Sequence, residues 1–166
     1  STLGTPVTIK SPDDEDIVSA QTRYITDYFN KMENAVFASN FDDPETGYRQ
    51  YLDLDSFLKH FLVGEMSGNT DTYWSVYMTK DRDSDKFFTG PVWDFDIAFD
   101  NDQRTYPIAA HTDYIFATKG SVASEAMRDL VSRIVKDDKG ASQRLLELWS
   151  EARTTKGLDE TSLLEF

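Results

Sequence analysis

The chain has 166 residues and a formal charge of −13 at pH 7; 39% of its residues are hydrophobic and 13% aromatic. This length suits a single domain over residues 1–166, and its 22 aromatic residues argue against disorder. The absence of Cys excludes disulfides, thiolate metal sites and Cys nucleophiles. The acidic balance argues against nucleic-acid binding, since phosphates need Lys and Arg, and no apolar run is long enough for membrane insertion.

The acidic residues are unevenly divided, with 21 Asp and nine Glu. Asp is a poor helix former, so the excess suits turns, helix caps and hard cations such as Mg²⁺. For most of these Asp residues, a solvated acidic surface is the simpler interpretation. A function for any one of them has to be argued from its neighbours.

The first expected element is a long amphipathic helix over residues 12–37. Ser11-Pro12-Asp13-Asp14 combines a capping Ser, a Pro at the first helical position and acids in the first turn. Apolar residues then recur at helical spacing as far as Val36. A loop over residues 40–47 follows, because it is rich in Asp, Pro and Gly.

A second helix is expected from about Asp55 to residue 67, ended by Gly68-Asn69. Gly64 inside this helix indicates close packing against a neighbouring element. His60 lies between apolar neighbours, with no second ligand at helical spacing, so a structural role is favoured over metal binding.

A β-hairpin is expected over residues 73–93, because residues 73–80 are aromatic and β-branched and residues 86–93 repeat that character. The turn between them spaces Asp81, Asp83 and Asp85 like a calcium loop. It lacks the Gly at the sixth position and the Glu at the twelfth, so calcium is weakly supported.

Residues 94–118 are expected to be irregular, followed by a helix from about Ser121, a break at residues 137–140 and a last helix over about 141–153. The order of elements predicts an α+β fold with helices packed around a central β-hairpin.

Two acids follow the hairpin in Trp93-Asp94-Phe95-Asp96. If this segment is extended, Asp94 and Asp96 lie on one side, and packing against the aromatic residues would remove water from them. Two such carboxylates suit Mg²⁺ or Mn²⁺. The alternative is that both residues cap the following turn and face water.

A second candidate is Asn69-Thr70-Asp71, just before the hairpin. The hairpin would return Asp94 to the neighbourhood of Asp71, although 23 residues separate them in the sequence. One acid could then orient a hydroxyl while the other holds a metal bound to phosphate. A simple helix cap and the acid pair of a glycoside hydrolase are the alternatives.

Four stretches within residues 48–100 share a pattern with one known family. They are Tyr51-Leu-Asp53-Leu-Asp55-Ser-Phe57, Gly64-Glu65-Met66 with Asn69-Thr-Asp71, Tyr77-Met-Thr-Lys80-Asp81-Arg82, and Gly90-Pro-Val-Trp-Asp-Phe-Asp96. In this order and spacing the chain resembles the CotH kinase family, the spore coat protein H-like atypical protein kinases.

The resemblance implies phosphoryl transfer from ATP, with Mg²⁺ or Mn²⁺, to Ser or Thr of a protein. It also implies a fold like the larger lobe of an atypical kinase. In this resemblance Asp71 matches the catalytic Asp, Asn69 belongs to the cofactor-binding part of the same motif, and Asp94 matches the metal-binding Asp. Asp96 is implied as a further metal ligand or a supporting acid.

The sequence departs from kinase patterns in three places. No Asn occurs in residues 72–76 to act as another metal ligand, Asp96 stands where a kinase has the Gly of Asp-Phe-Gly, and Asp100-Asn101 replaces the usual Gly-Asn. These departures keep open a non-catalytic surface or structural module as the alternative function.

The chain begins at Ser1 and contains no Gly-rich phosphate loop. We therefore expect it to be the C-terminal, catalytic-acid part of a larger protein whose nucleotide-covering lobe lies upstream. The isolated chain is then expected to be inactive. A secreted, cell-surface or envelope location in a bacterium is the accompanying expectation.

Overall fold

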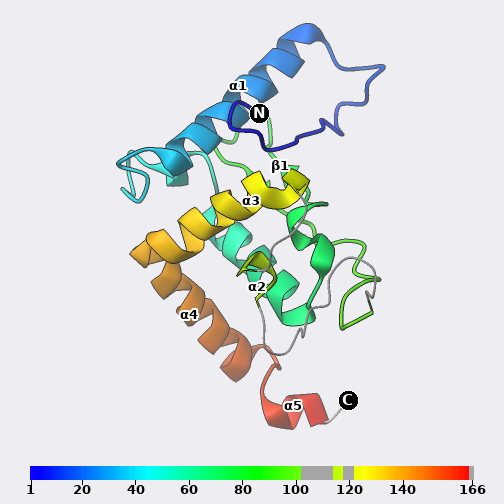
Figure 1. Ribbon diagram of the computed structural model, residues 1–166, viewed down its shortest axis with the longest axis vertical. Helices are drawn as coiled ribbons and strands as arrows, with labels where there is room; N and C mark the ends of the chain where they lie inside the picture. Colours follow the sequence, from blue (N-terminus) through cyan, green and yellow to red (C-terminus); the bar gives the residue numbers. More distant parts are fainter. Residues whose placement is uncertain (102–113, 118–121, 165–166) are drawn as a thin grey trace.

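The computed structural model describes residues 1–101, 114–117 and 122–164 (Figure 1). The described elements are the α-helices α1 (Ser19–Phe37), α2 (Leu54–Ser67), α3 (Val122–Ser132), α4 (Lys139–Thr155) and α5 (Glu160–Leu164), the 3₁₀ turns η1 (Tyr48–Gln50), η2 (Thr70–Tyr73) and η3 (Ile115–Ala117), the π-helical turn η4 (Arg133–Asp137), and the strands β1 (Met78–Thr79) and β2 (Phe88–Thr89). In Figure 1, α1 and the N-terminus lie at one end and α5 at the other.

The expected α+β fold is correct only in part. Within the described residues the protein is mostly helical, with a single antiparallel sheet of two short strands. Met78 pairs with Thr89 and Thr79 with Phe88, so the hairpin exists but is far shorter than the predicted 73–93. A sheet this small cannot form a central layer, and the helices supply most of the core.

The predicted first strand is shortened because its beginning winds into η2. The side chain of Asn69 accepts a hydrogen bond from the backbone N–H of Asp71 at 3.2 Å and starts the turn. The carbonyl of Asp71 then accepts from the N–H groups of Trp74 and Ser75, both at 2.9 Å. Local capping therefore overrides the strand propensity of these aromatic residues.

The hairpin is fixed to the start of α2 by backbone hydrogen bonds. Phe87 donates to the carbonyl of Tyr51 at 2.8 Å, and Asp53 donates to the carbonyl of Phe87 at 2.9 Å. The N–H of Thr89 donates to the hydroxyl of Ser56 at 3.1 Å. These bonds hold β2 against α2 and fix where the chain goes after the hairpin.

The first helix begins later than predicted. Asp16 and Ile17 both donate to the carbonyl of Asp13, but the turn ends there, because Val18 is extended with φ −98° and ψ 154°. Helix α1 starts at Ser19, and the side chain of Gln21 accepts the N–H of Val18 at 2.9 Å. The predicted end, at residue 37, is confirmed.

The second helix is close to the prediction. Asp53 caps α2 by accepting a backbone N–H at 2.8 Å, and Gly68 ends it with a left-handed φ of 63°. A Cβ on Gly64 would collide with the side chain of Thr72, so this Gly does mark a close approach, between α2 and η2. His60 is buried, and burial lowers its pKa, which favours the neutral imidazole.

The predicted break at residues 137–140 is correct in part: η4 ends at Asp137 and α4 begins at Lys139, two residues before the predicted start of the last helix at about 141. Asp138 caps α4 by accepting the N–H of Ala141 at 3.0 Å. The same carboxylate accepts from the hydroxyl of Tyr48 at 2.7 Å and from the guanidinium of Arg49 at 2.6 Å. The junction is thus tied to η1. The short helix α5 was not predicted, and the expected start of α3 at Ser121 lies outside the described residues.

One hydrophobic core joins the helices to the hairpin. Its buried members are Phe29, Met32, Val36, Phe41, Tyr48, Leu52, Phe57, Leu58, Phe61, Tyr73, Phe87, Ile115, Leu130, Val131, Ile134, Ala141 and Leu148. The aromatic start of the predicted strand was expected to pack on the apolar stripe of α2 through Trp74 or one of its strand neighbours. Trp74 is 58% exposed, and its neighbour Tyr73 is the one that lies in the core. The 3₁₀ turn explains this exchange, because it changes which side chain faces inward.

Candidate functional site

The first candidate acid, Asp71, lies in η2, directly after the end of α2. Its neighbour Asn69 is 3% exposed, and its side chain is used to cap this turn. Asp71 is partly exposed, and its carbonyl holds the next two N–H groups. The backbone around Asp71 is therefore fixed, while its side chain remains accessible to solvent.

The second candidate segment, residues 90–101, is irregular. Asp94 and Asp96 are both exposed, so the expected removal of water by Trp93 and Phe95 is not found. Strand β2 ends at Thr89, and the alternation that would have placed both acids on one side does not apply. The strand that was predicted to continue through Trp93 ends at Thr89, so the prediction for these two acids was wrong.

Unusual backbone conformations concentrate in this segment. Within the described chain, Asp94, Phe99 and Asp100 are the non-Gly residues with left-handed φ, at 54°, 56° and 62°. Asp adopts this conformation with modest cost, but a bulky Phe does so rarely. Backbone strain of this kind is found most often at functional sites, where surrounding contacts maintain it.

Two hydrogen bonds hold the second segment against the first. The indole N–H of Trp93 donates to the carbonyl of Ser75 at 3.1 Å, and its ring meets that of Tyr77 edge-on, with 4.8 Å between centroids. The N–H of Phe99 donates to the carbonyl of Ser67 at 2.5 Å. Residues 93 and 99 are therefore attached to the backbone on the two sides of η2, and the expectation that Asp71 and Asp94 are neighbours stays a prediction.

The fit of a metal ion depends on how many ligands the protein must provide. No group of three or more His, Asp or Glu side chains in the described ranges is arranged to hold a metal, and this includes the Asp81, Asp83 and Asp85 turn. A calcium ion held by protein oxygens alone does not fit such a donor set. Mg²⁺ fits better, because it is commonly bound by one or two carboxylates with water and substrate phosphates.

A buried carboxylate next to the candidate site was not singled out by the sequence reasoning. Glu65 on α2 is 9% exposed. It accepts hydrogen bonds from the hydroxyl of Tyr73, from the N–H of Ile115 at 2.8 Å and from the N–H of Phe116 at 3.0 Å. The sequence signal that could have identified Glu65 is an acidic residue on the side of α2 that also carries the buried apolar residues.

Burial is the main cause of the pKa shifts of Glu65 and Tyr73. Burial raises the pKa of Glu65, although its hydrogen bonds with Tyr73, Ile115 and Phe116 oppose that shift. Burial and the nearby Glu65 carboxylate raise the pKa of Tyr73 well above its ordinary value, so Tyr73 remains a hydroxyl donor. A neutral donor facing a carboxylate is the arrangement that the structure requires.

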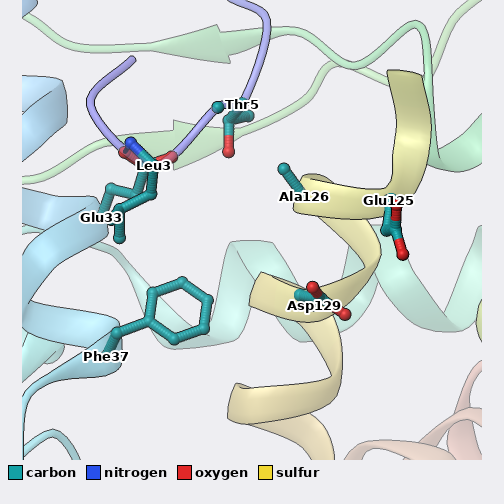
Figure 2. Close-up of a pocket in the computed structure, with 8 residues that line it drawn as sticks. Leu3, Thr5, Glu33, Phe37, Glu125, Ala126 and Asp129 are labelled. Atoms are coloured by element: carbon teal, nitrogen blue, oxygen red, sulfur yellow. Dashed lines mark hydrogen bonds between the residues drawn. The ribbon is translucent and has the colours of Figure 1, made fainter. Parts of the chain in front are cut away.

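A surface hollow of about 540 Å³ lies elsewhere in the protein (Figure 2). It is formed by the N-terminal segment, α1 and α3, and Figure 2 shows Glu33 and Phe37 of α1 across from Asp129 of α3. None of the candidate residues Asn69, Asp71, Asp94 and Asp96 lines it. The hollow and the candidate site are separate features.

Comparison with known proteins identifies the family. The family model described as CotH kinase protein matches residues 6–156, so the chain belongs to the CotH kinase protein family. No significant match was found among curated proteins or among solved structures. Within the described residues, none of the helices combines the length and apolar character needed to cross a membrane.

Proposed function

We propose that this chain provides the catalytic acids of a metal-dependent protein kinase that transfers phosphate from ATP to Ser or Thr. Membership of the CotH kinase family supports a kinase-related role. The observation that carries the proposal is the attachment of residues 93–99 to the backbone around η2, through Trp93 with Ser75 and Phe99 with Ser67. This attachment holds the two acidic motifs on adjoining segments.

In this proposal Asp71 receives the acceptor hydroxyl. A carboxylate on a fixed turn accepts the hydrogen bond of a Ser or Thr hydroxyl and directs its oxygen toward the γ-phosphate. Asn69 supports the site through its cap on the N–H of Asp71, which fixes the start of η2. Phosphoryl transfer depends mainly on positioning and charge neutralisation, and a fixed carboxylate contributes the positioning.

Asp94 and Asp96 are proposed as the residues that hold Mg²⁺ or Mn²⁺ together with the phosphates of ATP. When bound, the metal neutralises charge on the phosphates. The exposure of both carboxylates suits this shared coordination, because each remains open to a ligand from solvent. The left-handed backbone at Asp94 directly follows Trp93, whose indole is held by the carbonyl of Ser75.

The sequence has no Gly-rich phosphate loop, so the proposal assigns this chain the acidic half of the transfer site. The parent protein is proposed to contain a nucleotide-covering lobe and to act outside the cytoplasm or at the envelope of a bacterium. The larger-lobe resemblance to atypical kinases is part of the same proposal.

A non-catalytic surface module remains the second candidate. Large apolar side chains lie exposed next to the candidate acids, with Phe99 at 79% and Trp74 at 58% exposure. Exposed aromatic residues in one region are typical of protein contact surfaces. This candidate predicts no transfer and no nucleotide binding in the parent protein.

The test of the metal assignment uses the intact parent protein and Asp94→Asn. Nucleotide affinity is measured with and without Mg²⁺, and phosphate transfer is measured on a Ser/Thr-rich protein. We expect Asp94→Asn to lose the Mg²⁺-dependent part of ATP affinity and to reduce transfer about 100-fold or more, as for removal of a charge-stabilising group.

The control is Asp83→Asn, which removes an exposed carboxylate from the hairpin turn. It should leave both ATP affinity and transfer unchanged. An Asp94→Asn protein with the wild-type response to Mg²⁺ contradicts the metal assignment, and a wild-type parent without transfer favours the surface module.

A further inference from the structure

The buried carboxylate of Glu65 joins three parts of the chain. It projects from α2, receives the hydroxyl of Tyr73 in η2, and receives the N–H groups of Ile115 and Phe116 in η3. The bonds to Ile115 and Phe116 are 2.8 and 3.0 Å long. The other buried acids of the described residues are Glu33 and Asp138. Neither of them bonds to the candidate catalytic turn η2.

This position requires a carboxylate. One oxygen of Glu65 accepts from Tyr73 and Phe116, and the other accepts from Ile115. A Gln side chain has one acceptor oxygen and one NH₂ donor. Whichever way the amide turned, its NH₂ would face a backbone N–H, so a buried donor would be left unsatisfied.

The turn held by Tyr73 carries Asp71 and is followed by the attachment point of the Asp94 segment. Tyr73 ends η2, and Asp71 lies two residues before it in the same turn. The carbonyl of Ser75, just after η2, accepts the indole of Trp93 and so holds the segment that contains Asp94. A shift of η2 would therefore displace both Asp71 and the attachment of Asp94.

Steric contact reinforces the same placement. Gly64, adjacent to Glu65, leaves no room for a Cβ beside the side chain of Thr72 in η2. The turn is thus held by close packing on one side and by a hydrogen bond from Tyr73 on the other. Packing limits how near η2 approaches α2, and the carboxylate prevents it from moving away.

We propose that Glu65, acting through Tyr73, is a positioning residue that sets η2 and thereby places Asp71 and the Asp94 segment relative to each other. This inference rests on the proposed function for its catalytic meaning. The placement itself is a property of the folded chain and is measurable without ATP. Glu65 touches no reacting group in this proposal.

The experiment is backbone amide hydrogen exchange on this chain, resolved by residue, for the wild type, Glu65→Gln and Tyr73→Phe. We expect Glu65→Gln to raise the amide exchange rate at least about tenfold in two places. One is the pair of amides of Ile115 and Phe116 in η3, and the other is the pair of amides of Trp74 and Ser75 after η2. Tyr73→Phe should raise exchange of Trp74 and Ser75 only, because the backbone bonds to Glu65 remain.

Glu33→Gln is the matched control. Glu33 is also a fully buried acid, and its carboxylate accepts the N–H of Leu3 at 3.0 Å, far along the chain from η2. It should leave exchange of Trp74 and Ser75 unchanged. Leu3 keeps its acceptor, because the Gln amide can turn its oxygen to the N–H of Leu3 and its NH₂ to the hydroxyl of Ser1, which also accepts. The amides of Ala141 and Ser142 at the start of α4 report global opening in all three variants.

A uniform rise at all amides in both Glu65→Gln and Tyr73→Phe would overturn the proposal, because it indicates a general loss of stability. Unchanged exchange of Trp74 and Ser75 in folded Tyr73→Phe would also overturn it. If Glu65→Gln fails to fold, the Tyr73→Phe result decides alone. If the parent protein has no kinase activity, the proposed function is wrong. The exchange measurement still tests the placement of η2 by Glu65 independently of that result.

Discussion

Replacing Asp138 with Ala should strongly destabilise the η4–α4 junction. The side chain of Asp138 is 2% exposed and accepts hydrogen bonds from Tyr48, Arg49 and Ala141. Ala would leave a buried hydroxyl, a guanidinium and the N–H of Ala141 without their acceptor. Breaking a buried charge pair costs about 3–5 kcal/mol, and loss of an N-cap costs about 1 kcal/mol.

These two costs share the same carboxylate, so they do not add in full. Arg49 is 20% exposed and can recover part of its hydration, which lowers the cost of leaving it unpaired. We therefore expect Asp138→Ala to lower the free energy of unfolding by about 3–4 kcal/mol. That is a large share of the stability of an ordinary domain.

The assay is urea denaturation at pH 7, with Asp137→Ala as the control. Asp137 is the adjacent acid, but its side chain is 53% exposed and its ion pair with Arg133 lies on the surface. Its removal should cost less than about 1 kcal/mol. Equal losses for the two variants would refute the argument that burial and capping at residue 138 stabilise this junction.

The same carboxylate predicts a pH dependence. Burial favours a higher pKa for Asp138, but hydrogen bonds from Tyr48, Ala141 and Arg49 outweigh it and lower the pKa in the folded state. A lowered pKa gives stability that is fully present above the unfolded value, about 4, and is lost as the pH falls through the folded value. The difference in unfolding free energy between wild type and Asp138→Ala should shrink below about pH 4.

Two further changes test the region of η2. Gly64→Ala should destabilise the protein by about 1–3 kcal/mol through contact with Thr72, exceeding the gain of about 0.5–1 kcal/mol that Ala brings to a helix; urea denaturation measures this, and a more stable Gly64→Ala protein would contradict the packing argument. Trp93→Phe removes the hydrogen bond to Ser75 and should raise exchange of the Phe99 amide while changing the unfolding free energy by no more than about 1.5 kcal/mol. Unchanged exchange of Phe99 would mean that Trp93 does not hold this segment.

The sequence predicted well where local chemistry and hydrophobic spacing agree. Helix α2 combines a capping Asp53, a regular apolar face and a terminal Gly68, and it was placed within about one residue. The family was also identified correctly from ordered motifs within residues 48–100. These signals are short-range, so they do not depend on knowing the tertiary contacts.

The sequence misled where a local cap competes with composition. Residues 73–80 have the composition of a strand, but Asn69 and Asp71 start a turn that uses the first of them. At Ser11-Pro12 the error is the opposite one. These residues have the composition of a helix start, but Val18 is extended and the helix begins only at Ser19. Capping residues mark possible helix ends, and tertiary contacts decide which of these are used.

The roles of the candidate site residues stay predictions, and the environment predicted for them was wrong in part. Asp71 and Asp94 were chosen from motif order, and Trp93, next to Asp94, donates to the carbonyl of Ser75 just after η2. The expectation that Asp94 is desolvated was wrong, because the strand ends at Thr89 and the acid is exposed. Glu65 was missed because its partners Ile115 and Phe116 lie about 50 residues further along the chain.

The central claim is that Asp71 positions the acceptor hydroxyl for phosphate transfer. The most direct measurement is the rate of labelled phosphate transfer from ATP to a Ser/Thr-rich protein by the intact parent, comparing wild type with Asp71→Ala at matched nucleotide occupancy. The account predicts a loss of about 100-fold or more with ATP affinity unchanged, because Ala has no oxygen to accept the hydrogen bond of the acceptor hydroxyl. Wild-type transfer by Asp71→Ala would contradict it.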